Sequence, residues 1–266
     1  MRVLTWNVWW RFGPWQRRAD AILTVLREAD ADLIGLQEVW AQGNDNQAAQ
    51  LASELGLHWT FEPLANPEPW QRRLGDRSVA IGNAILSRRP IDDRAVLELP
   101  GPEQRSALFA STGGVPFFTT HLEAPITASA IRCEQVRALA GFVAEHSRAA
   151  HPPVITGDFN ALPDSDELRL FSGVRTAPAV PGLVLIDAWE YAEPGQPAAT
   201  WDTANPHVAA TFTPSARVDY IHVGVPGRNG AGHVTAVRRT GAAPVDGVWP
   251  SDHAAVVAEL RTLIAN

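Results

Sequence analysis

The stretch Pro153-Val154-Ile155-Thr156-Gly157-Asp158-Phe159-Asn160 joins a short apolar run to a polar cluster. Residues 153–156 are typical of a buried strand, and an aspartate and an asparagine follow closely after it. An Asp or Asn after a strand is most often a turn former or a helix cap. Enzymes built on sheets, however, also bind their ligands where strands end. Asp158 and Asn160 are therefore candidate site residues if other strands carry similar groups.

Similar polar clusters accompany five other strand-like runs. Each offers a carboxylate, amide or imidazole group next to apolar residues such as Leu4-Thr5-Trp6 or Gly35-Leu36-Gln37. The residues concerned are Asn7, Glu38, His121, Asp219, Asp252 and His253. Taken singly, a His or Asp of this kind is usually a satisfied polar group. The ordered set of six clusters predicts that distant segments converge into one pocket when the chain folds.

The beginning of the chain alternates strand-like and helical patterns. Residues 2–8 are rich in strand-forming side chains, and residues 17–28 carry apolar residues at helical spacing. A second apolar run over 32–39 is followed by a helical pattern over 46–55. This order indicates a β-α-β-α start.

From Ser78 onward, short apolar runs are separated by Pro and Gly turns, which predicts consecutive antiparallel strands. A long helix is predicted over 128–145. Further strands are predicted at 183–189, 218–223, 233–238 and 255–260. This alternation favours an α/β fold, a four-layer αββα sandwich in which two mainly antiparallel mixed sheets pack face to face with helices outside. No internal boundary stands out, so we expect one domain over 1–266.

Composition excludes several classes of protein. The 266 residues include 22 basic and 29 acidic side chains, for a net charge of −7. Every basic residue is an arginine, which excludes Schiff-base chemistry on lysine and a P-loop. The single cysteine, Cys133, excludes an internal disulfide, so we expect a reducing, cytoplasmic setting. No apolar run approaches the roughly 20 residues of a membrane span. We expect a monomer.

Two motifs are specific enough to indicate a family. Gly157-Asp158-Phe159-Asn160 and Ser251-Asp252-His253 occur intact and in order, and residues 82–87 fit as an accompanying strand. On these motifs the chain resembles the endonuclease/exonuclease/phosphatase superfamily, which includes deoxyribonuclease I, and the resemblance runs from Asn7 to His253. It implies a metal-dependent hydrolase of phosphate ester bonds, foremost a Mg²⁺-dependent phosphodiesterase in which water attacks phosphorus.

The resemblance also implies a role for each catalytic residue. His253 would handle the proton of the attacking water, with Asp219 as the carboxylate that fixes its tautomer. Asp158 would orient or deprotonate this water, and whether Asp158 or His253 takes the proton stays open. Asn160 would donate hydrogen bonds to phosphoryl oxygens. His121 would bind the phosphate or protonate the leaving oxygen.

The donor types of this set suit a hard cation. Carboxylate and amide oxygens are preferred by Mg²⁺ and by Mn²⁺, which the sequence does not separate. Glu38 is the best ligand candidate, Asn7 supports it directly or through water, and Asp252 is a third ligand. Zinc is disfavoured, because none of the eight histidines occurs in a His-Glu-x-x-His arrangement.

One departure from the family pattern concerns His121. In deoxyribonuclease I the matching histidine pairs with a glutamate on an earlier strand, whereas residues 77–83 of this chain contain no acid. The departure favours phosphate binding by His121, with Asn83 in support.

Tryptophan is the other unusual feature, since the chain contains ten. Tryptophans more often belong to a core than to a ligand platform. Three of them fall on predicted site loops, namely Trp10, Trp40 and Trp249. We expect these three to rim the cleft and to stack on, or shelter, an apolar or planar part of the substrate.

Other functions stay open at this point. A DNA or RNA endonuclease or exonuclease of the same superfamily is one alternative, although the net charge of −7 does not favour nucleic acid. A non-catalytic binding protein that keeps the fold is another, but all eight catalytic and metal-site residues are present. A serine hydrolase is disfavoured because no Gly-x-Ser-x-Gly motif occurs.

Overall fold

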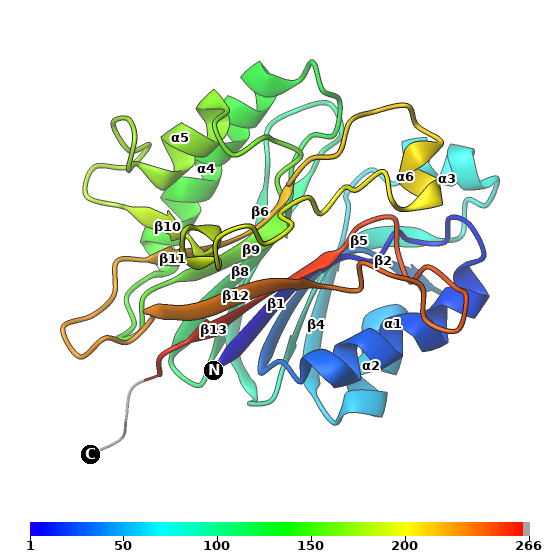
Figure 1. The fold of residues 1–266 in the computed structure, drawn as a ribbon, viewed down its shortest axis with the longest axis horizontal. Helices are drawn as coiled ribbons and strands as arrows, with labels where there is room; N and C mark the ends of the chain where they lie inside the picture. The colour runs from blue at the N-terminus through cyan, green and yellow to red at the C-terminus, as the bar shows by residue number, and fades with distance from the viewer. Residues whose placement is uncertain (263–266) are drawn as a thin grey trace.

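The structure, a computed structural model, describes residues 1–262 and contains two β-sheets stacked face to face (Figure 1). The strands of the first sheet are β1 (Arg2–Asn7), β2 (Leu33–Gln42), β3 (Asp45–Asn46), β4 (His58–Pro63), β5 (Ala80–Ser87), β12 (Val234–Thr240) and β13 (Ala255–Leu260). Their order is β12-β13-β1-β2-β5-β4, with β3 paired to β2. β1 and β2 are parallel, and the other pairs are antiparallel.

The second sheet has the order β10-β11-β9-β8-β7-β6. Its strands are β6 (Ile91–Glu98), β7 (Ser106–Thr112), β8 (Val115–His121), β9 (Val154–Asp158), β10 (Leu185–Asp187) and β11 (Asp219–Gly224). β8 and β9 are parallel, and the other pairs are antiparallel. The prediction of two mixed, mainly antiparallel sheets is confirmed.

Helices form the outer layers and one end of the molecule. They are α1 (Trp15–Ala29), α2 (Gln47–Leu55), α3 (Glu68–Leu74), α4 (Ser129–His146), α5 (Asp166–Ser172), the 3₁₀ turn η1 (Ala188–Tyr191) and α6 (Pro206–Ala209). α1 and α2 cover the outer face of the first sheet, and α4 and α5 cover the second (Figure 1). The predicted α/β sandwich with helices outside is therefore confirmed. The short helices α3 and α6 both lie at the right-hand end of the view.

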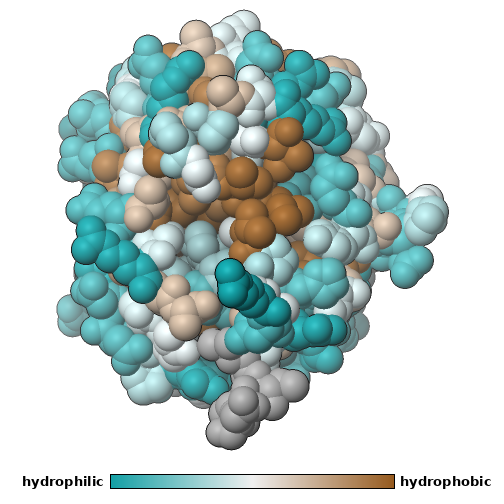
Figure 2. All heavy atoms as spheres, turned by 90° about the vertical axis from the view of Figure 1, so that its left-hand side faces the viewer, coloured by the Kyte–Doolittle hydropathy of each residue, from teal (hydrophilic) through white to brown (hydrophobic). Residues whose placement is uncertain are grey.

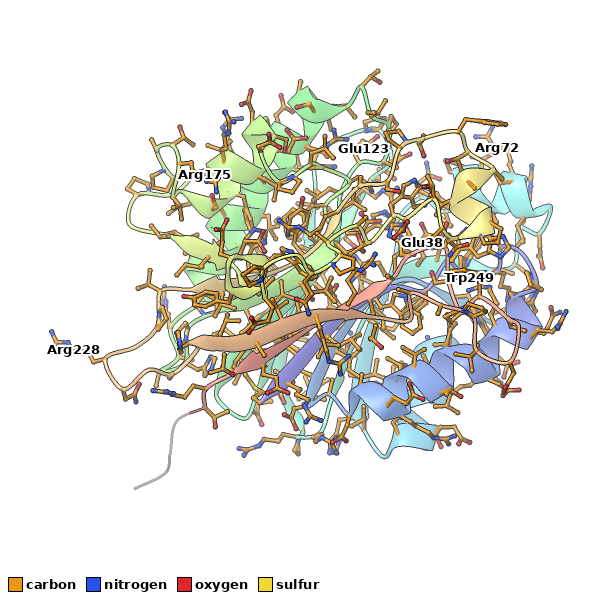
Figure 3. All side chains as sticks on the ribbon, viewed as in Figure 1. Glu38, Arg72, Glu123, Arg175, Arg228 and Trp249 are labelled. Atoms are coloured by element: carbon orange, nitrogen blue, oxygen red, sulfur yellow. The ribbon has the colours of Figure 1, made fainter. Side chains whose placement is uncertain are left out.

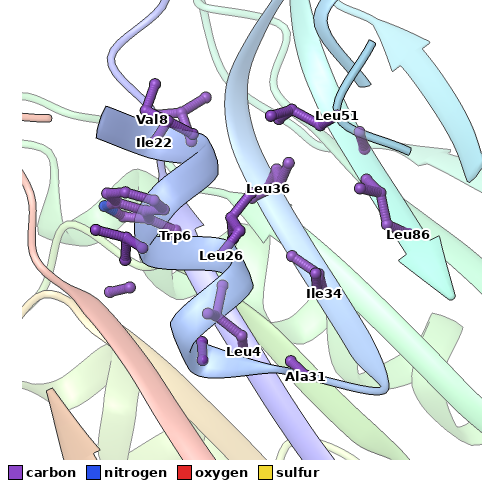
Figure 4. Packing of buried hydrophobic residues seen from close by; sticks show 14 of the residues in the cluster. Leu4, Trp6, Val8, Ile22, Leu26, Ala31, Ile34, Leu36, Leu51 and Leu86 are labelled. Carbon is purple, nitrogen blue, oxygen red and sulfur yellow. The ribbon is translucent and has the colours of Figure 1, made fainter. Parts of the chain in front are cut away.

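Apolar side chains fill the three interfaces between these layers. Leu4 and Trp6 of β1 face outward and pack against Leu26 of α1 (Figure 4). Val3, on the opposite face of the same strand, belongs to the cluster between the two sheets. A third cluster around Phe118 lies between the second sheet and α4. The alternation along β1 follows from the period of two residues in a strand.

Strand direction brings the predicted site segments to one end of the sandwich. β1, β8 and β9 end there with Asn7, His121 and Asp158. β11 runs antiparallel to β9 and therefore starts there, with Asp219 opposite Asp158. β13 runs antiparallel to β1, so the segment that leads into it arrives at the same end. The carboxyl ends of the two parallel pairs thus define the location of the site.

The opposite end of the sandwich is different in character. It is the end at which Arg228 is labelled in Figure 3, and Figure 2, which views the molecule from that side, shows a band of apolar atoms across it. Val225, just after β11, is 59% exposed. None of the described helices combines the length and the apolar composition that crossing a bilayer requires.

Candidate active site

The centre of the site is an imidazole between two buried carboxyl groups. His253 Nδ1 lies 2.8 Å from Asp219 Oδ2, and His253 Nε2 lies 3.8 Å from Asp158 Oδ2. Burial alone would lower the pKa of His253, but the charges of Asp219, Asp158 and Asp252 raise it well above its usual value. The carboxyl groups around His253 therefore favour its protonated form.

Asp158 connects most of the other site residues. Its Oδ2 accepts a hydrogen bond from Asn7 Nδ2 at 3.1 Å and faces His121 Nε2 at 3.4 Å. Its Oδ1 accepts the backbone N–H of Asn160 at 3.0 Å. Burial, and then the charge of Asp219, raise the pKa of Asp158 to about 7. A carboxyl group with this pKa can accept and release a proton near neutral pH.

Asn160 is held in an uncommon backbone conformation. Its φ of 48° lies in the left-handed region, and its Nδ2 donates to the carbonyl of Leu122 at 3.1 Å. That carbonyl belongs to the residue after His121, so Asn160 links the ends of β8 and β9. Non-glycine residues in this conformation cluster at functional sites.

Glu38 supplies the clearest indication of a cation. It lies at an irregularity of β2, where the register with β5 shifts between Leu36 and Val39, and its φ is 55°. Its Oε1 accepts from Asn7 Nδ2 at 3.3 Å, while Oε2 is buried with no hydrogen-bond partner among the described residues. A buried carboxylate oxygen without a partner is costly, and a hard divalent cation would satisfy it. The residues present therefore fit Mg²⁺ or Mn²⁺.

Asp252 and Trp249 lie on the segment that leads into β13. Asp252 is buried, which raises its pKa to about 7, with His253 opposing this shift and the charge of Glu38 adding to it. Asp252 and Trp249 both line a small cavity of about 10 Å³. Figure 3 shows Trp249 at the same end of the molecule as Glu38. A cation between Glu38 and Asp252 would relieve their mutual repulsion.

A second arrangement of ligand atoms lies beside the first. Asp158, Asp219 and His253 offer atoms that all lie within 4.8 Å of one another, and Asp219 Oδ1 is buried without a hydrogen-bond partner among the described residues. His253 and Asp219 already bond to each other, so we assign this triad to proton handling and place the ion at Glu38. The triad is the second group of residues that could hold an ion.

His121 is held by a residue that the sequence analysis did not single out. Arg105 lies just before β7, is 2% exposed, and has its Nη1 2.9 Å from His121 Nδ1. Burial, then the charges of Arg105 and His253, keep the pKa of His121 well below its usual value. His121 is therefore neutral at physiological pH. The only sequence signal for such a partner was the absence of an acid in residues 77–83.

Asn83 lies beside the site but is used in packing. Its Nδ2 donates to the carbonyl of Ser106 at 3.0 Å, and Thr120 Oγ1 donates to the same carbonyl at 3.1 Å. Asn83 stands on β5 of one sheet and Ser106 on β7 of the other. The amide thus joins the two sheets, and we leave it out of the substrate-binding set.

The expectation that Trp10 and Trp40 line the rim of the cleft is wrong. Their exposed fractions are 1% and 6%, and they pack in a buried cluster with Trp70 and neighbouring aliphatic residues. Trp10 Nε1 donates to the carbonyl of Ala80 at 2.9 Å. The rings fill an interior space below the site loops and offer no open face for stacking. Trp249 is half-buried and keeps an accessible position.

A buried arginine from α1 organises the loops around the site. Arg18 donates to the backbone carbonyls of Val8, Trp9, Trp10, Phe12 and Pro250. Four of these residues follow Asn7, and the fifth precedes Asp252. Ser251 Oγ adds a 2.6 Å hydrogen bond to the carbonyl of Asn7. Sequence reasoning missed Arg18 because one arginine in an amphipathic helix normally lies on its solvated face.

The loop after His121 is held by α4 in the same way. Arg132 Nη1 donates to the carbonyls of Glu123 and Pro125 at 3.0 and 2.8 Å, and Gln135 Oε1 accepts the backbone N–H of Glu123 at 2.9 Å. Arg132 is itself paired with the buried Glu167 at 2.7 Å. These two helix residues therefore fix the loop after His121.

A larger cavity lies away from the strand-end cluster. It has a volume of about 400 Å³ and is lined by charged side chains that include Arg2, Asp30 and Arg88. These groups pair with one another. We therefore place the chemistry at the strand-end cluster, where Glu38 Oε2 and Asp219 Oδ1 are buried without a hydrogen-bond partner among the described residues.

Comparison with known proteins identifies the family of this chain. The sequence profile of the Endonuclease/Exonuclease/phosphatase family matches residues 4–253. The chain belongs to this family. Its members are generally phosphoester hydrolases and generally use divalent metals. No sequence match was found among the curated proteins.

Solved structures of the family share the fold with this chain. A Beutenbergia cavernae endonuclease/exonuclease/phosphatase is 24% identical, with a TM-score of 0.70 over 98% of this chain and 71% of that one. The human Nocturnin catalytic domain with bound sulfate is 22% identical, with a TM-score of 0.71 over 97% and 93%. D. rerio TDP2 complexed with single-strand DNA product is 21% identical, with a TM-score of 0.76 over 98% and 99%.

Proposed function

We propose that this chain is a Mg²⁺- or Mn²⁺-dependent phosphodiesterase that uses water as its nucleophile. The observation that carries the proposal is the set of contacts around Asp158, which joins Asn7, His121 and His253 within 3.1 to 3.8 Å. Acid–base groups, a buried carboxylate and amide donors meet there, next to the unsatisfied Glu38. Phosphoester hydrolysis needs this combination.

Glu38 and Asn7 would hold the metal, with Asp252 as a third ligand. When bound, the ion supplies positive charge that neutralises the phosphoryl oxygens. Asn7 also donates to Asp158, so the residue that touches the metal ligand Glu38 also orients the group that handles the proton. The metal site and the acid–base site are in this way one connected unit.

Asp158 is the proton acceptor in this proposal. Three carboxyl groups around His253 favour its protonated form by raising its pKa, whereas the pKa of Asp158 is about 7. Asp158 therefore takes the proton of the attacking water, and the imidazolium of His253, oriented by Asp219, donates to a phosphoryl oxygen. Asn160 donates a second hydrogen bond to the phosphate.

A nuclease is the second candidate function. It is favoured by the structural likeness to D. rerio TDP2, which was solved with a single-strand DNA product. The net charge of −7 opposes it, because nucleic-acid binding normally depends on basic surface. A non-catalytic protein that binds phosphate esters is the candidate of a different class, and the test below separates all three.

The test compares bis(p-nitrophenyl) phosphate with p-nitrophenyl phosphate, each with Mg²⁺, with Mn²⁺ and with a chelator. We expect faster hydrolysis of the diester, abolished by the chelator. His253→Gln should lower turnover by at least about a hundredfold, the usual scale for loss of acid–base help. The exposed His58→Gln is the matched control. Hydrolysis that survives chelation, or a folded His253→Gln protein with unchanged turnover, would contradict the proposal.

A single-stranded oligonucleotide then separates the two catalytic candidates. Cleavage of the oligonucleotide at a kcat/KM far above that of the chromogenic diester would identify a nuclease. Binding of either substrate without turnover, in the presence of both metals, would identify a binding protein.

We propose further that the chain acts as a monomeric, single-domain protein in the cytoplasm. The single cysteine and the acidic net charge support this assignment. Light scattering on the eluted protein tests the oligomeric state, and limited proteolysis tests the single domain. Localisation of a tagged chain tests the compartment.

A further inference from the structure

Arg105 is fixed by three partners at the edge of the site. Its Nη1 lies 2.9 Å from His121 Nδ1, and its Nε and Nη2 lie 2.8 and 2.7 Å from Glu103 Oε2. Its guanidinium carbon lies 4.7 Å from the centre of the Trp70 ring. With 2% of its surface exposed, the side chain has little freedom to leave this position. The carboxylate of Glu103 balances its charge.

The chemistry of these partners determines where His121 carries its proton. A guanidinium has only donors and is not deprotonated in proteins, so it cannot accept a hydrogen bond. At 2.9 Å from Arg105, His121 Nδ1 must therefore be the acceptor. The proton of the neutral ring then lies on Nε2, which faces Asp158 Oδ2 at 3.4 Å.

The other imidazole of the site is held in the opposite sense. His253 Nδ1 lies 2.8 Å from the Asp219 carboxylate, which is an acceptor, so Nδ1 of that ring carries a proton. The two histidines point their Nε2 atoms at the same Asp158 oxygen. An arginine partner and a carboxylate partner thus give the two rings different tasks.

We infer that Arg105 is a positioning residue that locks His121 as a neutral Nε2–H donor for a phosphoryl oxygen of the substrate. The inference rests on the proposed function and decides between the two roles open for His121, in favour of phosphate binding. A neutral ring whose single proton is held as a hydrogen-bond donor binds an anionic oxygen, whereas a leaving oxygen would need a charged imidazole to protonate it. Burial and the charge of Arg105 both act against the charged form.

This arrangement also accounts for the missing acid. Residues 77–83 contain no carboxyl group that could pair with Nδ1 of His121. Arg105 occupies the place of that partner and reverses its hydrogen-bond direction. An acid there would accept from Nδ1 and leave Nε2 free to pick up or release a proton. The arginine gives this histidine a binding role instead.

The decisive measurement is the tautomer of His121, read from the imidazole ¹⁵N chemical shifts of histidine-labelled protein. His121→Asn identifies the His121 signals by their loss. We expect an unprotonated Nδ1 and a protonated Nε2 in the wild type. Arg105→Lys, which keeps a donor, should preserve this state, and Arg105→Met should lose it. Inorganic phosphate should shift the Nε2 signal in the wild type and much less in Arg105→Met.

A protonated Nδ1 in the wild type would overturn the inference, and so would an Arg105→Met protein whose His121 tautomer and phosphate response are unchanged. The wild-type measurement requires no Arg105 variant, so a poorly folding Arg105→Met protein does not block it. It also requires no turnover. Absence of chelator-sensitive hydrolysis would refute the proposed function while leaving the tautomer result to decide the role of Arg105.

A kinetic comparison supplies the second readout. If Arg105 acts through phosphate binding, Arg105→Met should raise KM for the diester at least about tenfold with a smaller change in kcat, and Arg105→Lys should restore most of this loss. An equal fall in kcat and kcat/KM, with KM unchanged, would assign Arg105 to the chemical step and contradict the positioning role.

Discussion

Gly35 of β2 faces Thr156 of β9 across the gap between the two sheets, so closely that a Cβ atom on Gly35 would lie 2.1 Å from Thr156 Oγ1. Thr119 of β8 closes the same space at 2.8 Å. Beside this contact, Gln37 Nε2 donates to Thr119 Oγ1 at 2.8 Å. This close approach of the two sheets lies two residues before Asp158 on β9 and, through the pairing of Gly35 with Thr5, two residues before Asn7 on β1. Asn7 of one sheet must reach Asp158 of the other there. Their spacing is therefore part of the active-site geometry.

Replacing Gly35 by alanine should push the sheets apart. We expect Gly35→Ala to lower the free energy of unfolding by about 1–3 kcal/mol, the usual cost of overpacking, and to reduce turnover as well. Urea denaturation measures the first effect. Gly141→Ala, on α4 where a Cβ meets nothing within 4 Å, is the matched control and should be neutral or stabilising. Equal stability of the two variants would contradict this account.

The catalytic and metal candidates were accessible from the sequence because each stands beside a strand-like run as a charged or amide group. Their convergence depends on strand order, which local patterns do not encode. The parallel pairing of β1 with β2 and of β8 with β9 is what aligns Asn7 and Asp158. The ordered set of motifs therefore predicted the residues and their convergence, and the topology supplied the strand order that produces it.

The errors have a shared physical cause, since side-chain type does not reveal burial. No helix was predicted between residues 55 and 128, yet α3 forms over Glu68–Leu74 and its Trp70 is buried. Trp10 and Trp40 were placed on the rim and lie in the same interior cluster. Arg18 and Arg105 belong to a residue type that is mostly exposed, and only the partners in the folded chain show their roles.

The six hydrogen bonds from Arg18 to backbone carbonyls make it hard to replace. Lysine keeps the charge but has three donors and no planar fork, so several buried carbonyls would lose their partner. We expect Arg18→Lys to destabilise the protein by on the order of 3 kcal/mol. The neighbouring Arg17, which is exposed, gives the control variant Arg17→Lys. Guanidinium denaturation of the two proteins should differ clearly, and coinciding midpoints would rule out a role for Arg18 in holding the loops.

Glu38 should determine the response to metal without any need for substrate. We expect saturating Mg²⁺ to raise the melting temperature of the wild type, since a ligand at a hundred times its Kd stabilises by about 2.7 kcal/mol. Glu38→Gln should lose most of this increase, because it removes the unpartnered carboxylate oxygen. Glu54→Gln removes an exposed acid from α2 and should respond as the wild type does. A full Mg²⁺ response in Glu38→Gln would move the ion to the triad of Asp158, Asp219 and His253.

The buried acids predict how stability depends on pH in the presence of a chelator. In the folded state the pKa of Asp158 and of Asp252 is raised from 3.8 to about 7, so between these values the folded protein holds protons that the unfolded chain has released. The free energy of unfolding must then fall as the pH rises from about 4 to about 7. The raised pKa of His253 acts in the same direction, and its contribution is lost only as the pH passes the pKa of the folded state.

Asp252→Asn removes one of these protons. It should reduce the slope of the free energy of unfolding against pH by about 1.4 kcal/mol per pH unit between pH 5 and about 6.5. Asp92→Asn, at an exposed position, controls for the lost charge. Denaturation series at three pH values measure how the free energy of unfolding depends on pH. If Asp252 were ionised in the folded protein, this free energy would change with pH equally in Asp252→Asn and the wild type. That result would contradict the raised pKa of Asp252.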